Sequence, residues 1–98
     1  MKTRNKVEKE IEKGLTGAGK LKILRLLMEQ PHHAYTRYEI GKKVTNDPLS
    51  IRNDLTTLVE INWITEYQIQ HLKKYSINYC NPIVTLLADF LRKISYLH

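Results

Sequence analysis

The stretch from residue 36 to residue 64 contains two short helical patterns, each with its own start signal, and then a run typical of a strand. Thr36 stands three residues before Glu39, the spacing at which a hydroxyl and a carboxylate each accept a hydrogen bond from the other residue's backbone amide. The sequence therefore predicts a helix of about eight residues that begins near Arg37. The turn-favouring residues Thr45–Asp47 then end this helix.

A second helix is predicted immediately after this turn. Asp47 can cap it, and Pro48 suits its first position because the amide donor that proline lacks has no helical partner there. Apolar residues then recur at helical spacing and are expected to face the core, while polar residues occupy the other faces. The apolar set consists of Ile51, Leu55, Leu58 and Val59. A short polar surface is left free to contact a partner.

The flanking segments complete the pattern. Alternating residues at 65–69 and 75–77 predict two strands of a hairpin around residues 70–74. An earlier helix, which Thr16 is expected to cap, ends at residues 31–35, where a short third strand is expected. The core-facing stripe of that earlier helix consists of Leu21, Leu24, Leu27 and Met28.

This order of elements resembles that of the winged helix-turn-helix family of prokaryotic transcriptional regulators, in particular its arsenic-repressor and multiple-antibiotic-resistance-regulator branches. The matching residues are Ser50, Leu55 and Leu58 of a Ser-x-x-x-x-Leu-x-x-Leu helix and the pair Trp63-Ile64 that opens the hairpin. The resemblance covers roughly residues 16 to 80. It implies a mainly α fold with a small β hairpin (α+β), in which a winged helix-turn-helix domain has an extra N-terminal segment and a long C-terminal helix.

Three parts of the chain are expected. Residues 1–14 form a basic N-terminal arm or helix, residues 15–80 the winged helix domain, and residues 81–98 a C-terminal dimerisation helix. Two alternatives remain open for the first part: a frayed arm, or an amphipathic helix. The apolar stripe of such a helix would consist of Val7, Ile11 and Leu15.

The predicted C-terminal helix carries two apolar stripes. Asn81 can cap this helix, and Pro82 suits its first position. Alternating spacings of four and three predict a coiled-coil seam at Ile83, Leu87, Phe90, Ile94 and Leu97. A second stripe consists of Val84, Ala88 and Leu91. We expect one stripe to meet the domain and the other a second copy of the chain. A monomer whose helix wraps over its own core is the alternative.

The charge balance favours a polyanionic partner, because 16 Lys or Arg stand against 10 Asp or Glu in 98 residues, a net charge of +6. The excess lies at the two ends of the chain, and residues 26–70 hold four basic against six acidic side chains. Neutralisation of DNA phosphates is therefore expected from the N-terminal segment and from two further groups. These groups are Arg37, Lys42 and Lys43 in the first helix of the pair and Lys73 and Lys74 in the hairpin.

The resemblance implies that the helix over about residues 48–60 reads the major groove and that the wing, about residues 70–74, contacts the backbone or the minor groove. Arg52 suits guanine edges and Asn53 suits adenine. Ser50, Thr56 and Thr57 are expected to meet phosphates or thymine methyl groups. Asp54 has two interpretations: it accepts from a cytosine amino group, or it orients Arg52.

Other functional classes find little support in the sequence. Residues 14–20 match the first seven positions of a phosphate-binding loop, but Leu21 supplies no hydroxyl for magnesium and no hydrophobic strand precedes the loop. The pair His32-His33 lacks metal-ligand partners at suitable spacing, and the last helix offers only Asp89 and His98 for metal sensing. We expect no metal, no cofactor and no enzymatic activity.

The expected partners are double-stranded DNA and a second copy of the chain; an effector ligand is left open. No apolar run approaches the about eighteen residues needed to span a bilayer, and the lone Cys80 cannot form an internal disulfide. A cytoplasmic, nucleoid-associated regulator is therefore expected. The alternative is a winged-helix module for protein interaction or chromatin architecture with weak nonspecific DNA binding, which the acidic balance of the central region favours.

Overall fold

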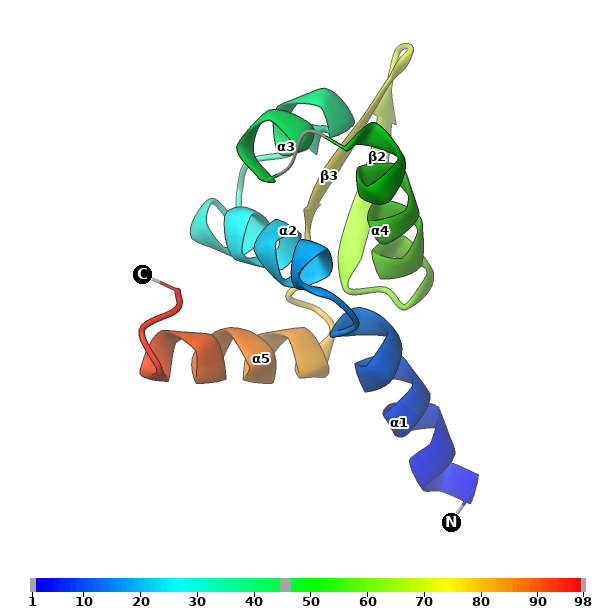
Figure 1. Cartoon of the computed structure of the whole chain (residues 1–98), viewed down its shortest axis with the longest axis vertical. Coiled ribbons are helices and arrows are strands. Elements are labelled where there is room, and N and C mark those ends of the chain that lie inside the picture. The colour runs from blue at the N-terminus through cyan, green and yellow to red at the C-terminus, as the bar shows by residue number, and fades with distance from the viewer. Residues whose placement is uncertain (1, 45–46, 98) are drawn as a thin grey trace.

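The protein consists of five helices and a small antiparallel sheet in a computed structural model that describes residues 2–44 and 47–97, with side chains from residue 6 onward. Along the chain the elements are α1 (Lys2–Gly14), α2 (Ala18–Glu29), β1 (Tyr35–Thr36), α3 (Arg37–Val44), α4 (Pro48–Glu60), β2 (Ile64–Ile69), β3 (Leu72–Ile77) and α5 (Pro82–Lys93). The hairpin of β2 and β3 projects from one end of the molecule, and α1 and α5 lie at the other end (Figure 1). The expected fold class, mainly α with a small β hairpin, is confirmed.

One apolar cluster holds the helices against the sheet. Its largest fully buried side chain is Trp63, and α4 contributes the predicted Ile51, Leu55 and Leu58. In α2 the buried stripe consists of Ile23, Leu24, Leu27 and Met28. The predicted Leu21 is only partly buried and packs at the edge of the cluster. None of the described helices is long and apolar enough to cross a membrane.

Three helix starts follow the predicted capping chemistry. The backbone amide of Thr36 donates to Glu39 Oε1 at 2.8 Å, and the amide of Glu39 donates to Thr36 Oγ1 at 3.1 Å. Asp47 caps α4 by accepting from the amide two residues ahead at 3.1 Å, and Asn81 caps α5 in the same way at 2.9 Å. These bonds satisfy amides that have no partner within the helix. Residues 45 and 46 of the predicted turn lie outside the described residues.

The start of α2 differs from the prediction. Its N-cap position is Gly17, with φ 79° and no side-chain cap. Thr16 donates its hydroxyl instead to the carbonyl of Glu12 in α1, so the predicted capping role of Thr16 is wrong. The physical reason is that the last carbonyls of α1 have no helical partners and lie within reach of a hydroxyl that follows the helix directly.

The reversal between α4 and β2 is a Schellman motif. Asn62 has φ 64°, and its amide donates to the Val59 carbonyl at 3.0 Å. The amide of Trp63 donates to the Leu58 carbonyl, also at 3.0 Å. Asparagine tolerates this left-handed conformation better than most residues. The motif turns Trp63 into the core directly beneath α4 and starts β2 one residue later.

The turn of the β2–β3 hairpin is shorter than predicted. β3 lies between β1 and β2, and β2 and β3 stay paired from Ile64 with Ile77 up to Ile69 with Leu72. Only residues 70 and 71 form the turn, and Gln70 reverses the chain with φ 57°. The expected loop over residues 70–74 is therefore wrong, because cross-strand pairing extends beyond it. The predicted third strand is present as β1, which pairs with β3.

The C-terminal helix is shorter than the predicted residues 81–98, since α5 ends at Lys93. Ser95 adopts φ 66°, and the amides of Tyr96 and Leu97 both donate to the Leu91 carbonyl, at 2.9 and 3.1 Å. This second reversal folds the chain back onto its own domain. Leu97, predicted on the dimer seam, is only 3% exposed and belongs to the core of its own chain.

Candidate nucleic-acid interface

Burial of one side of α4 determines which residues of this helix face solvent. Ile51, Leu55 and Leu58 are buried, so the polar side of α4 points outward. Among the predicted DNA-contacting residues of α4, the structure leaves Ser50, Arg52, Asn53 and Thr56 exposed and Thr57 partly buried. They form a continuous outward strip along the helix, as residues three and four apart lie side by side.

The hydroxyls on this strip have partners within α4. Ser50 Oγ donates to Asp47 Oδ2 at 2.7 Å, and Thr56 Oγ1 donates to the Arg52 carbonyl at 2.9 Å. The side chains of Arg52 and Asn53 make no hydrogen bond or ion pair with other described residues. They are therefore the groups on α4 best able to donate to a base edge without breaking an existing bond.

Asp54 faces α2 and pairs there with a lysine. Its Oδ1 lies 3.3 Å from Lys20 Nζ, and both side chains are largely buried, 19% and 12% exposed. Gly19 allows this approach, because a Cβ there would lie 2.5 Å from Asp54 Oδ2. Asp54 therefore has a partner within the protein, and neither predicted role, acceptance from cytosine or orientation of Arg52, is seen among its contacts within the described chain. Lys20 belongs to the run at residues 14–20 that matches part of a phosphate-binding loop, and in the structure it pairs with this carboxylate.

The predicted cations of α3 lie on the surface near the start of α4. Arg37, Lys42 and Lys43 are all exposed. Lys42 Nζ lies 5.3 Å from the centre of the Tyr38 ring, within the range of a cation–π contact. The Tyr38 side chain is 73% exposed, so the Tyr38 ring and Lys42 lie together on the surface of α3.

The wing combines cations with apolar side chains. Lys73 is exposed and lies 3.9 Å from Glu66 across the hairpin, while Lys74 is partly buried opposite Tyr67. The end of the hairpin also exposes three large apolar side chains that sequence analysis did not single out. They are Tyr67, Ile69 and Leu72, with exposed fractions of 46, 55 and 57%.

Apolar side chains also remain exposed at the opposite end of the molecule. The stripe of Val84, Ala88 and Leu91 in α5 packs into the core. On the other side of this segment Phe90 and Ile94 are more than half exposed, and Ile83 and Leu87 are partly buried. Leu86, which the predicted seam omitted, is also exposed, as are Val7 and Leu15 around α1.

The histidines and the cysteine are not gathered into a metal site. Within residues 2–44 and 47–97 no group of three or more His, Cys, Asp or Glu is arranged to hold a metal ion. His33 packs its ring edge against Tyr35, with ring centres 4.3 Å apart. Cys80 is exposed and unpaired within the described chain.

Solved structures of bacterial proteins share this arrangement over nearly the whole chain. HlyU from Vibrio cholerae superposes with a TM-score of 0.77 at 13% identity, covering 97% of this chain and 98% of its own. M. tuberculosis Rv0081 gives 0.72 at 22% identity, covering 92% and 86%. The homodimeric winged helix-turn-helix DNA-binding domain of Mb0332 from Mycobacterium bovis, a possible ArsR-family transcriptional regulator, gives 0.70 at 14% identity, covering 94% and 83%. No family model matches the sequence, and no curated protein matches it as a relative.

The chain has the winged helix-turn-helix fold. In this fold α3 and α4 correspond to the helix-turn-helix pair, α4 stands at the position called the recognition helix, and the β2–β3 hairpin corresponds to the wing. The expected resemblance is confirmed at the level of the fold. In Figure 1 the recognition helix lies beside the wing, and α1 and α5 lie away from its tip.

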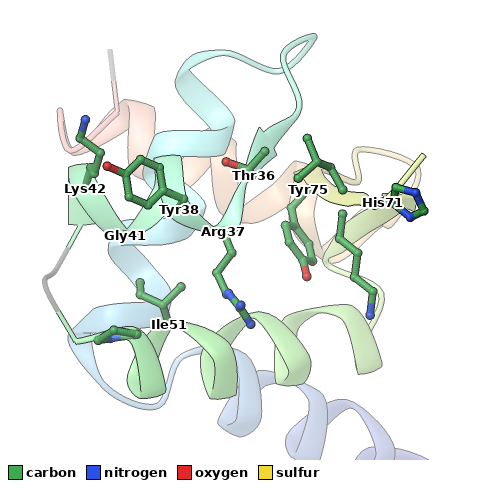
Figure 2. A pocket seen from close by; sticks show the side chains of 11 residues that line it. Thr36, Arg37, Tyr38, Gly41, Lys42, Ile51, His71 and Tyr75 are labelled. Atoms are coloured by element: carbon green, nitrogen blue, oxygen red, sulfur yellow. The ribbon is translucent and has the colours of Figure 1, made fainter. Parts of the chain in front are cut away.

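A groove of about 890 Å³ lies between α3, the start of the recognition helix and the wing; we call it the α3–wing groove. Figure 2 shows Arg37 and Tyr75 pointing into it, with Tyr38 and Ile51 to one side and His71 to the other. The remaining lining residues are Thr36, Gly41, Lys42, Pro48, Leu72 and Lys73. No acidic side chain of the described chain lines this groove.

The caps and the groove perturb nearby titrating groups. The backbone amide of Thr36 holds the pKa of Glu39 below its ordinary value, and the bonds from Ser50 do the same for Asp47. Burial raises the pKa of the Tyr75 hydroxyl, and Glu66 nearby acts in the same direction. Both capping carboxylates are therefore ionised at neutral pH, and Tyr75 keeps its proton.

Proposed function

We propose that the protein is a sequence-specific double-stranded DNA-binding transcriptional regulator that acts as a homodimer. The recognition helix enters the major groove, and the wing follows the backbone or the minor groove. The observation that carries this proposal is the outward strip of α4, whose polar side chains face solvent beside the cations of α3 and the wing. Base-reading groups and phosphate-binding groups therefore lie on adjoining surfaces, as a duplex requires.

Within this docking, Arg52 and Asn53 read base edges. A guanidinium pairs with the O6 and N7 atoms of guanine, and a carboxamide pairs with N6 and N7 of adenine. Thr57 and the hydroxyls that already serve α4 are suited to phosphate oxygens or thymine methyl groups. Arg37, Lys42, Lys43 and the two wing lysines neutralise phosphates and set the register of the helix in the groove.

A second copy of the chain would cover the exposed side of α5. Leu86, Phe90 and Ile94 follow one another at helical spacing and are 70, 56 and 55% exposed, and apolar side chains grouped in this way are typical of an interface. A two-fold interface there would present two recognition helices to half-sites roughly one helical turn of DNA apart. The Mb0332 domain, of the same fold, is homodimeric, which supports this arrangement. The alternative of a monomer leaves this apolar surface uncovered.

Regulation would then follow from occupancy of a promoter region, where bound protein excludes or recruits polymerase. Its site of action is the nucleoid, because chromosomal DNA is the partner. No reacting group is needed for this mechanism, in agreement with the regulatory roles that the names of the neighbouring structures describe.

The first experiment selects bound sequences from a random duplex pool and then measures affinity for the enriched pool against salt concentration. We expect an inverted repeat, with one half-site for each recognition helix. The logarithm of affinity should fall linearly with the logarithm of salt concentration, with a slope set by the phosphates contacted. Recovery of no motif, together with weak and steeply salt-dependent binding, would contradict site-specific regulation.

The second candidate is a protein-interaction or chromatin-architectural module with weak nonspecific DNA binding. The apolar end of the wing favours it, because Tyr67, Ile69 and Leu72 form a surface that a protein partner would bury. The same selection distinguishes the two functions. A module of this kind binds all sequences nearly equally, and replacing Arg52 by alanine leaves that binding unchanged.

A further inference from the structure

The three exposed apolar side chains of the wing lie on one face of the hairpin. Ile69 and Leu72 stand directly opposite each other in the last pair before the turn, and Tyr67 precedes Ile69 by two residues. Cross-strand partners share a face, and so do residues two apart in a strand. The hairpin therefore ends in a pair of branched apolar side chains, Ile69 and Leu72, which we call the tip pair.

The tip pair is open to solvent, although water disfavours apolar surface. Its side chains are 55 and 57% exposed, and neither belongs to the core cluster or packs against it. The turn between them, Gln70 and His71, is exposed as well. In Figure 1 the end of the hairpin extends beyond α4. Stability of the domain therefore gives no reason for apolar residues at these two positions.

The charges around the tip pair match a polyanion. Lys73 and Lys74 follow Leu72 directly, and Lys74 shares the apolar face because it is the partner of Tyr67. Glu66 is the only acidic residue from 64 to 77, and it already lies 3.9 Å from Lys73. Proteins that wedge DNA combine these two kinds of side chain, since cations hold the backbone while an apolar side chain enters between base steps of the minor groove.

The size of the apolar surface favours DNA over a protein partner. A stable protein interface covers about 800 Å² on each side. The tip pair and Tyr67, each about half exposed, offer far less. A wedge needs only one or two branched side chains, because it fills the space opened between two adjacent base pairs.

We propose that the tip pair enters the minor groove beside each half-site, wedges between two base pairs and bends the duplex. This inference rests on the proposed function, because the recognition helix must first place the wing on DNA. It adds a second source of specificity, in which the protein prefers sites that unstack easily at the wing although no side chain there reads a base edge. Pyrimidine–purine steps such as TA unstack most easily, and A-tracts resist unstacking.

The first test measures bending and unstacking in the duplex enriched by selection. Energy transfer between dyes at the two ends reports the end-to-end distance. The base analogue 2-aminopurine, placed in turn along the flanking minor groove, becomes brighter where stacking is lost. With the wild-type protein we expect a shorter end-to-end distance and one bright step beside each half-site. Binding to the motif with the duplex straight and fully stacked would overturn the proposal.

Variants at the end of the hairpin separate the wedge from the charges. Ile69→Thr combined with Leu72→Thr removes the apolar wedge and keeps both lysines, and threonine suits a strand. This double variant should bind the same motif and leave the duplex straight. Lys73→Gln is the matched control: it should lower the affinity and the salt dependence but keep the bend. If the double variant bends DNA as the wild type does, or if Lys73→Gln alone abolishes the bend, the wedge is overturned.

Two duplexes that differ only at the wedged step separate deformation from base readout. TA and AA steps present the same acceptors in the minor groove, but AA is stiffer. The wild-type protein should bind the TA duplex about tenfold more tightly, and the double variant should bind the two duplexes equally. If a motif is selected but the wild type shows no such preference, the wedge alone fails. If no motif is selected, the proposed function fails and the wedge fails with it.

Discussion

Glu10 in α1 accepts a hydrogen bond from the indole nitrogen of Trp63, with 2.6 Å between Oε2 and Nε1. The same oxygen accepts a hydrogen bond at 3.3 Å from the side-chain Nδ2 of Asn81, the residue that caps α5. Asn81 also donates to the carbonyl of Asn62 at the end of the recognition helix, again at 3.3 Å. One carboxylate oxygen of α1 thus accepts from Trp63, just after α4, and from Asn81, at the start of α5, so it joins three segments that are far apart in the sequence.

Replacing Glu10 by alanine should destabilise the fold. The indole nitrogen of Trp63 is in a fully buried side chain and would lose its acceptor, which costs about 1 to 3 kcal/mol. Urea unfolding followed by the fluorescence of this single tryptophan measures the loss. The exposed Glu8 in the same helix supplies the control, and Glu8→Ala should change stability by less than about 0.5 kcal/mol. Equal losses of stability in the two variants would mean that the hydrogen bonds of Glu10 contribute nothing to stability.

The two capping carboxylates predict a loss of stability in acid. The pKa values of Glu39 and Asp47 lie below the ordinary values of 4.5 and 3.8 because backbone and side-chain donors hold the ionised forms. In the unfolded chain these donors are lost and the pKa values return to normal. The contribution is therefore present above the ordinary values and disappears as pH falls through the lowered ones.

Melting temperatures measured between about pH 7 and pH 2 test this linkage. Glu39→Gln keeps a side-chain acceptor without the charge, so its melting temperature should fall less steeply in acid than that of the wild type. Glu60→Gln, an exposed site outside both caps, is the matched control and should follow the wild-type curve. If the Glu39→Gln and wild-type curves run parallel, the cap does not titrate with folding.

Local capping signals could be read from the sequence because each depends on residues at most three apart. Thr36 with Glu39, and Asp47 before Pro48, need no tertiary information. The reversals at Asn62 and Ser95 were missed for a different reason. Left-handed residues after a helix are usually glycine, and at these two positions the sequence has asparagine and serine, which also occur throughout ordinary loops. The predicted length of the C-terminal helix failed at Ser95 for this reason.

In the candidate site, too, features that depend on local spacing were predicted, and features that depend on tertiary contacts were not. The outward face of α4 followed from helical spacing, which placed Arg52 and Asn53 on the surface. The role of Asp54 did not follow, because its partner Lys20 lies in another helix and only the fold brings the two together. The α3–wing groove is likewise formed by three elements, and no spacing in the sequence predicts it.

Arg52 and Asp54 are two residues apart in the recognition helix and should respond differently to substitution. Arg52→Ala should cost about 1 to 3 kcal/mol on the selected site and relax specificity at one position. Asp54→Asn should leave base preference unchanged, because this side chain faces Lys20 in α2. Competition binding with single-base variants of the selected site provides the measurement. A change of base preference in Asp54→Asn would show that this carboxylate reaches the DNA.

Placing a charge on the exposed side of α5 should dissociate the proposed dimer. Phe90 is 56% exposed in one copy of the chain, and Phe90→Glu would bury an unpaired carboxylate in the interface. Sedimentation or light scattering should show a shift of mass from dimer toward monomer. Arg92→Glu alters the charge of the same helix at an exposed position on a different face and should leave the mass unchanged. A wild-type protein that is already monomeric would remove the dimer from the proposed function.

Replacement by alanine should lower the stability of the protein at Gly14 and raise it at Gly41. A Cβ on Gly14 would lie 2.3 Å from two carbons of the Trp63 ring, which is fully buried and cannot move aside freely. Gly14→Ala should therefore cost about 1 to 3 kcal/mol through overpacking. Gly41 lies within α3 with open space around it, so Gly41→Ala should stabilise the protein by about 0.5 to 1 kcal/mol through reduced backbone entropy. Urea midpoints of the two variants test both signs. If Gly14→Ala leaves the stability unchanged, the contact of α1 with Trp63 is loose and does not require a glycine at this position.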